Sequence, residues 1–253
     1  MRRGGRKFAA VWVLVLGCWA MASAAADAEE TTSGERWDYS LAVFLWGVGM
    51  DGTTQRGDRI DLGFQDVFDD LNLGFMGALE ARKDRWFIGA DLLFVDVDAS
   101  KAGTIGSTAV PTEADLDLTA WMLTLKGGRN VLDAERASVD LLLGARFLDV
   151  TSRLDFRIGP LSPGTKQKVS SWDAVVGVKG NLNISESWFL PYYADVGTGM
   201  SELTWQAMGG VGYRFGWGNL VFVYRHIAWE FRSDEELANL SFTGPSLGAV
   251  FSF

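Results

Sequence analysis

The stretch SLGAVFSF, residues 246–253, closes the sequence and indicates its fold class. Its apolar and its small residues alternate: Leu247, Ala249, Phe251 and Phe253 occupy one parity, and Ser246, Gly248 and Ser252 occupy the other. Because successive side chains of a β-strand point to opposite faces, this alternation predicts a strand with one apolar face. A chain terminus is usually disordered unless something holds it. We therefore expect neighbouring strands to hold this segment, and the question is what its apolar face contacts.

The first residues predict export from the cytoplasm. Basic residues among positions 2–7 precede an apolar run at 8–20 and a small-residue stretch at 22–26. This order is typical of a cleaved secretory signal peptide, which we expect to span residues 1–26. Cys18, the one cysteine, lies inside it, so we expect a mature chain without disulfides. The residues before Cys18 also resemble an imperfect lipoprotein cleavage site, which leaves lipidation of Cys18 as an alternative.

The charge and the hydrophobicity of the mature chain exclude several classes of protein. The full chain carries a formal net charge of −9 at pH 7, and its leader contributes only cations. The mature chain is therefore strongly acidic, which disfavours nucleic acid as a partner. After the leader, no apolar segment approaches the ~20 residues of a membrane-spanning helix. Residues 27–36 are polar and predict a short periplasmic linker.

From Trp37 onward, alternation in long runs predicts one all-β domain over residues 37–253. Strands of ~9–11 tilted residues are what a bilayer-spanning barrel requires. We predict ten strands: 37–49, 72–83, 85–98, 114–127, 136–150, 169–182, 187–198, 203–215, 219–232 and 241–253. Long connections are expected at 50–71, 99–113, 153–168 and 233–240, with short turns between the other strands except at 199–202.

This layout predicts a transmembrane antiparallel up-and-down β-barrel, because such barrels combine an even strand number with short turns at one end and long loops at the other. An additional short strand near 57–63 would make twelve strands, and eight is the other alternative.

Within the strands, charged residues share a parity that apolar residues avoid. In 136–150, for example, Leu141 and Leu143 oppose Asp140 and Arg146. A slip of one residue would exchange the two faces, so the pattern specifies the register. We predict a ladder of charges inside the barrel, formed by Glu80, Arg82, Asp91, Asp140, Arg146, Asp173, Lys179, Asp195, Arg214 and Arg225.

Alternation alone does not say which face is inside, and a soluble periplasmic carrier of apolar ligands would place the apolar face inward. Three features favour the opposite arrangement. Aromatic residues collect near strand ends on the apolar parity, as in the girdles at membrane interfaces. The charged face is rich in glycine and balanced in sign, which suits a narrow lumen filled with paired side chains. The chain is also longer than one soluble carrier barrel needs. We therefore expect the apolar face to contact outer-membrane lipid.

The final residues then acquire a role. Ser246, Gly248, Phe251 and Phe253 form a pattern that resembles the C-terminal signal by which outer-membrane barrels are recognised by their assembly machinery. We expect that machinery to be a partner of the last strand. We also expect this strand to pair with the first and close the barrel, since closure removes unpaired edges in lipid.

One longer stretch resembles a particular family. The residues WGVGMDGT at 46–53, FQDVF at 64–68 and DLNLGFMGALEAR at 70–82 resemble a group of porin-like outer-membrane proteins of Gram-negative bacteria. The similarity continues through Trp86, WDAVVG at 172–177 and GYR at 212–214, and so covers most of the mature chain. It implies the fold and the outer-membrane location, but no transported solute and no catalytic residue.

Enzymatic alternatives depend on a single side chain. His226 is the one histidine, which excludes a multi-histidine metal site. It would be the base of a hydrolase if Asp195 or Glu230 oriented it. However, His226 has the parity opposite to Arg225 and is expected in the outer wall of the barrel. We predict no enzyme activity, no catalytic residue, no cofactor and no metal.

The expected function is that of a narrow passive porin or a structural surface protein. About eight strands are just filled by their own side chains, so ten strands favour a sealed lumen over an open pore. The acidic connection at 50–71 is a candidate plug, in which Asp66, Asp69 or Asp70 would meet a lumen arginine. The sequence predicts neither a solute nor an oligomeric state.

Overall fold

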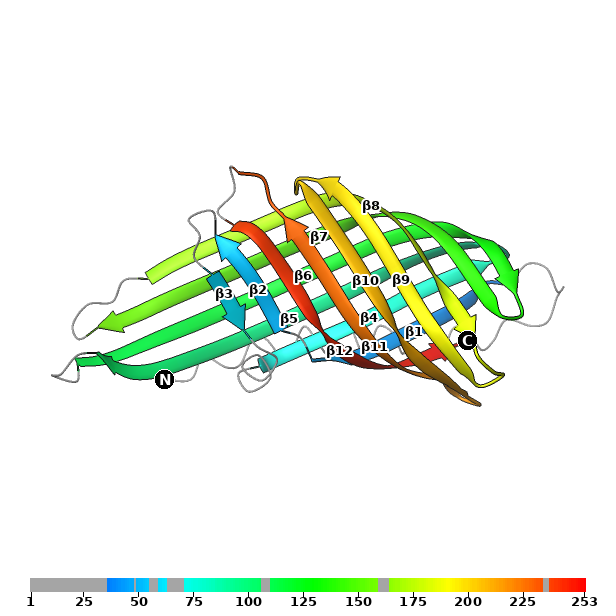
Figure 1. Ribbon diagram of the computed structural model, residues 1–253, viewed down its shortest axis with the longest axis horizontal. Coiled ribbons are helices and arrows are strands. Elements are labelled where there is room, and N and C mark those ends of the chain that lie inside the picture. The colour runs from blue at the N-terminus through cyan, green and yellow to red at the C-terminus, as the bar shows by residue number, and fades with distance from the viewer. Residues whose placement is uncertain are drawn as a thin grey trace. The chain divides into compact units, whose positions relative to one another are not determined.

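The computed structural model describes residues 36–47, 49–54, 59–62, 71–105, 110–158, 164–233 and 237–253. Trp37–Phe253 form one compact unit (Figure 1). Its strands are β1 (Asp38–Trp46), β2 (Gly49–Thr54), β3 (Arg59–Leu62), β4 (Leu71–Lys83), β5 (Trp86–Ile105), β6 (Val110–Ala134), β7 (Ala137–Ile158), β8 (Gly164–Asn183), β9 (Trp188–Gly199), β10 (Leu203–Phe215), β11 (Gly218–Glu230) and β12 (Leu237–Ser252). The expected signal peptide with Cys18 and the candidate plug residues Asp66, Asp69 and Asp70 lie outside the described residues. Within the described ranges, no helix has the length and hydrophobicity needed to cross a membrane.

The strands close into an antiparallel barrel. Each of β4–β12 pairs with the strand before it, except that β4 pairs with β1, and β12 pairs with β1 to close the ring of ten strands. At the chain end, the Phe253 N–H donates to the Tyr39 carbonyl, and the Tyr39 N–H donates to the Phe253 carbonyl, both at 2.9 Å. The predicted ten-stranded barrel and its closure by the last strand are confirmed.

The predicted connection at 50–71 contains structure of its own. β2 continues the course of β1 along β12, with Gly49 opposite Thr243, and β3 pairs with β2 outside the ring. The extra strand expected near 57–63 is therefore present as β3. It adds to the sheet without entering the closed barrel.

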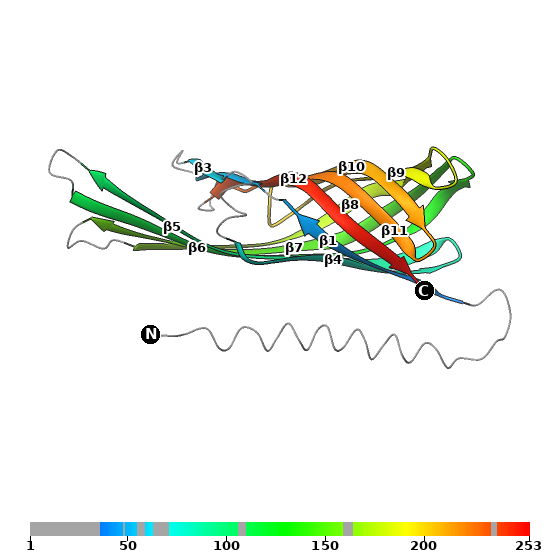
Figure 2. The same cartoon turned by 90° about the horizontal axis from the view of Figure 1, so that it is seen from below.

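Four strands extend far beyond the rest. β5 to β8 contain 20, 25, 22 and 20 residues, about twice what a bilayer crossing requires. Figure 2 shows them continuing past the ends of the other strands. The loops predicted at 99–113 and 153–168 are therefore wrong for most of their length, because these residues pair in register, for instance Ile105 with Val110 and Asp155 with Gly164. Their small and polar composition hid the strands, since a strand outside a bilayer needs no apolar face.

The barrel exposes its apolar face and buries its charged one. Leu143 is 70% exposed, whereas Arg146 on the opposite face of the same strand is 0% exposed. In a soluble barrel, these values would be reversed. The predicted inversion, with apolar side chains toward lipid, is confirmed.

Two aromatic belts bound this apolar band. At the short-turn end, Trp188 packs on Tyr213 with ring centroids 4.9 Å apart, and Tyr213 packs on Phe215 at 4.6 Å. Toward the other end, cross-strand pairs form the second belt, Phe94–Trp121 at 4.3 Å and Phe147–Trp172 at 4.7 Å among them.

The spacing of the belts matches a membrane. From Trp205, an exposed ring near the start of β10, to Phe215 of the first belt at its end, the tilted strand rises roughly 25 Å, which is the height of the apolar band in outer-membrane barrels. Beyond the second belt, the outward residues become charged, and Lys168 pairs with Asp149 at 3.1 Å. The outer parts of β5 to β8 therefore lie outside the bilayer. Because short turns face the periplasm in such barrels, these parts lie on the external side.

Candidate functional site

The half of the lumen toward the short turns, hereafter the inner half, contains a network of ion pairs. The Arg82 guanidinium contacts Asp140 at 2.5 Å and Glu80 at 3.0 Å. Glu80 also pairs with Lys179 from the far side of the barrel, and Lys126 pairs with Asp91 at 2.6 Å. Opposite charges from different strands thus neutralise one another across the lumen, which is how ionised groups tolerate burial.

One ion pair in the middle of the barrel is completely dry. Arg146 and Asp195 meet at 2.5 Å, and both side chains are 0% exposed. Arg146 also donates to Thr204 at 3.0 Å and to Gln206 at 3.2 Å, while the Tyr193 hydroxyl donates to Asp195 at 2.6 Å. These hydrogen bonds satisfy most of the groups that burial removes from water.

Arg225 lies beside this pair with a different set of partners. It donates to Gln206 at 3.0 Å and to the Met76 sulfur at 3.0 Å, and its guanidinium lies 5.2 Å from the Trp46 ring centroid. None of these three side chains carries a charge.

Seven residues of the predicted charge ladder take part in ion pairs, whereas Arg225, Asp173 and Arg214 do not among the described residues. Asp173 is buried but accepts hydrogen bonds from Ser171 and Ser201 and pairs with no cation among the described residues. Arg214 lies at the rim and bonds the Asn183 side chain and the Glu186 carbonyl.

Lys126, which pairs with Asp91, is absent from the prediction. Its parity, opposite to that of Trp121, Leu123 and Leu125 on the same strand, was the signal available in the sequence.

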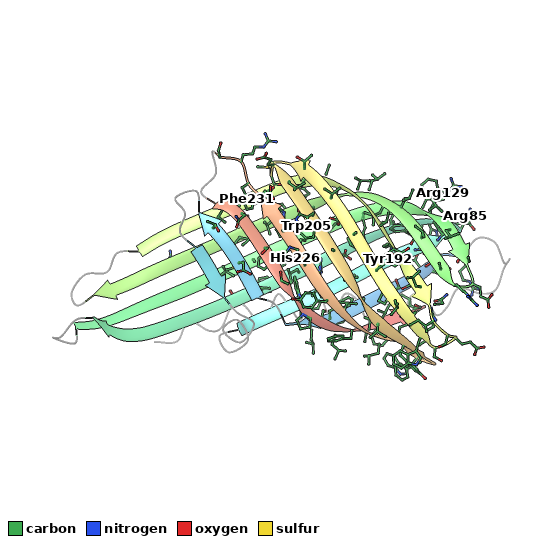
Figure 3. All side chains as sticks on the ribbon, viewed as in Figure 1. Arg85, Arg129, Tyr192, Trp205, His226 and Phe231 are labelled. Atoms are coloured by element: carbon green, nitrogen blue, oxygen red, sulfur yellow. The ribbon has the colours of Figure 1, made fainter. Side chains whose placement is uncertain are left out.

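A cavity of about 660 Å³ occupies this inner half. Its lining runs from Asp84, Arg85 and Asp133 near the short turns to Met76 and Arg225 in the middle of the barrel. Figure 3 shows Arg85 at the short-turn end. The cavity therefore faces the periplasmic side.

The half of the lumen toward the external side is apolar, which differs from the charged lumen that the sequence predicts. Trp229 and Ile227 are 0% exposed, and Phe242 is 2% exposed. They pack in one cluster with Met122 and Leu148. This apolar cluster, hereafter the apolar cap, also contains Met50, Met76, Leu93, Val95, Leu118, Ala120, Val150, Val169, Phe231, Leu237 and Leu240. It explains why apolar residues share the parity of Arg225 on β11.

Gly248, a residue of the predicted assembly signal, makes room inside the barrel. The Phe44 ring lies directly over it, and a Cβ on residue 248 would overlap that ring. Phe44 in turn packs against the apolar cap. The Phe44 ring therefore requires glycine at position 248, independently of any role of this residue in the assembly signal.

His226 lies on the outer wall, as its parity predicts. Its Nδ1 lies 2.6 Å from the Thr243 hydroxyl, and its ring packs on Trp205 at 4.6 Å (Figure 3). Asp195 is buried in the lumen on the other side of the wall, so the Asp195–His226 arrangement considered for a hydrolase is not formed. In the part of the chain that the structure describes, no cluster of three or more histidine, cysteine, aspartate or glutamate side chains could hold a metal.

Comparisons with known proteins concern the fold. No family model and no curated protein match the chain. Among solved structures, the translocator domain of the autotransporter NalP from Neisseria meningitidis is 14% identical, with 97% of each chain covered and a TM-score of 0.50. The attachment invasion locus protein Ail of Yersinia pestis is 12% identical, with 87% of this chain and 99% of Ail covered and a TM-score of 0.35. The transport unit of the autotransporter AIDA-I from Escherichia coli is 9% identical, with 93% and 96% covered and a TM-score of 0.39.

The first of these likenesses extends over the whole barrel. Together with the lipid-facing apolar band, it identifies the chain as a barrel of the outer-membrane type. The barrel fold expected from the sequence is therefore confirmed, and the exposed apolar band agrees with the expected outer-membrane location.

Proposed function

We propose that the protein is a sealed, non-conducting barrel that holds the outer parts of β5 to β8 above the membrane, and so acts as a structural surface protein. The apolar cap is the observation that carries this proposal. Trp229, Ile227 and Phe242 pack in one buried cluster in the external half of the lumen, and hydrophobic constrictions exclude ions because water leaves them. The dry Arg146–Asp195 pair in the middle of the barrel also supports the proposed seal.

The long strands supply a reason for such a seal. β6 and β7 stay paired from Ala134 and Ala137 outward to Thr112 and Ile158, well beyond the second aromatic belt. A rigid, packed barrel would fix the direction of this external sheet, whereas an open pore would need neither the cap nor the extension.

We expect purified protein in planar bilayers to pass no current in potassium chloride at any ionic strength. Heat-modifiable migration on a gel would show in parallel that the inserted protein is folded. Stepwise currents that grow with salt concentration, given by folded protein, would exclude the seal and favour the narrow porin that the sequence also allowed.

We also propose that the barrel-assembly machinery binds the last strand through its terminal aromatics. Phe253 is 60% exposed, and its ring stacks on Tyr39 with centroids 6.1 Å apart. An exposed ring at the strand end is available for recognition before the barrel closes.

Phe253→Ala is therefore expected to reduce the assembled protein in cells severalfold, as measured by heat-modifiable migration of outer-membrane fractions. Refolding into detergent should be nearly unchanged, because one exposed interfacial ring contributes little to stability. Phe215→Ala is the matched control, since Phe215 is an exposed ring of the same belt on another strand. Equal losses for both variants would contradict specific recognition.

A further inference from the structure

We infer that the blind end of the inner cavity is a binding site for a small anion with a carboxylate or phosphate group, which Arg225 receives. The proposed site lies on the periplasmic side of the apolar cap, and it does not depend on whether ions pass through the cap.

Arg225 differs from the other buried cations of the lumen. It is 5% exposed, yet its hydrogen-bond acceptors are the Gln206 amide oxygen and the Met76 sulfur. By contrast, Arg146, Lys126, Lys179 and Arg82 each contact a carboxylate. Among the residues that the structure describes, Arg225 is the buried lumen arginine without a carboxylate at ion-pair distance.

One atom of its guanidinium has no hydrogen-bond partner at all. The Arg225 Nε is buried and unpartnered, as are Asp195 Oδ1 and Trp229 Nε1. A buried N–H of a charged group that lacks an acceptor is costly, and the cost falls when an anion supplies one. A guanidinium also presents its N–H groups in a planar fork that matches carboxylate and phosphate oxygens.

The cavity gives such an anion a route and a space. Arg225 lines the end of the roughly 660 Å³ cavity, whose other end lies at Asp84 and Arg85 near the short turns. This volume is in the range of small-molecule sites, about 300–1,000 Å³. Because the apolar cap lies beyond Arg225, the ligand would enter and leave from the periplasmic side.

The neighbouring charges restrict the ligand. Lys126 and Lys179 line the same cavity but are occupied by Asp91 and Glu80. The carboxylates of Asp91 and Glu80 would repel a ligand carrying several negative charges. The site therefore fits a compact molecule with one anionic group, whose remaining atoms contact Phe44 and Met208 in the cavity wall.

The test is calorimetric titration of the full mature protein, folded in phosphatidylcholine vesicles, with sodium phosphate and separately with sodium acetate. Wild type should show saturable binding of at least one of them. Arg225→Gln should weaken that binding about tenfold or more, because it removes a charged hydrogen-bond donor. Arg214→Gln is the matched control, since Arg214 is a lumen arginine that lies outside the cavity lining.

A second variant, Gln206→Glu, allows the same test if Arg225→Gln does not fold. Gln206→Glu places a carboxylate on the side chain that already bonds Arg225 at 3.0 Å. It should satisfy Arg225 internally, keep the barrel folded and abolish anion binding.

Three outcomes would overturn the inference. They are no saturable binding by wild type, unchanged binding by folded Arg225→Gln, and unchanged binding by folded Gln206→Glu. Loss of the wild-type binding when phosphatidylglycerol is added to the vesicles would support the inference and identify a lipid headgroup as the occupant, because the headgroup would compete for the site. The absence of current leaves all of these results unaffected, so this site and the proposed seal are tested separately.

Discussion

Replacing Arg146 with methionine is expected to lower the free energy of unfolding of the barrel by about 3–5 kcal/mol. The change leaves the Asp195 carboxylate buried with only neutral donors, because both partners of this pair are 0% exposed. Transferring an unpaired carboxylate into a dry interior costs far more than the methionine regains by packing.

The measurement is urea-dependent unfolding from phosphatidylcholine vesicles, followed by tryptophan fluorescence. Adding Asp195→Asn to Arg146→Met should recover much of the loss, since no charge then remains unpaired. Lys168→Gln is the matched control because it breaks the exposed pair with Asp149, in which Lys168 is 61% exposed. Exposed pairs contribute about 0–1 kcal/mol. A comparably small effect of Arg146→Met would show that water reaches the pair and that the lumen is not sealed there.

Introducing arginine at Leu143 is expected to destabilise the barrel by about 2–4 kcal/mol, the cost of a cation on the lipid face near the membrane midplane. Leu143 is 70% exposed, and it lies on β7 between the short turn after Ala134 and the Phe147–Trp172 pair of the second belt. On a soluble protein, the same exposed site would accept arginine with almost no effect.

Ser170→Arg provides the comparison for this second change in the same unfolding measurement. Ser170 is exposed on the outward face of β8, beyond the second aromatic belt and opposite Asp149. We expect little change in stability there, because the side chain remains in water. Equal tolerance of arginine at both positions would exclude a lipid environment around Leu143.

The sequence predicted the barrel well because its main signals are local. Alternation with a period of two identifies the face of every strand, and it placed Leu143 outward and Arg146 inward. It also placed His226 in the outer wall, opposite to Arg225. The same local signal failed at 99–113 and 153–168, where strands outside the bilayer need no apolar face and therefore lack the contrast on which the prediction depended.

The sequence by itself determined which parity of most strands faces the lumen, and the tertiary structure decided what the residues of that parity do there. Arg146 and Asp195 are 49 positions apart, and Arg82 and Asp140 are 58 positions apart. Such pairs form only because strand tilt and register bring particular levels of distant strands across the lumen, and these quantities belong to the closed barrel rather than to any one strand. For the same reason, the apolar cap and the unpaired position of Arg225 could be recognised only after the strands had been assembled around a common interior.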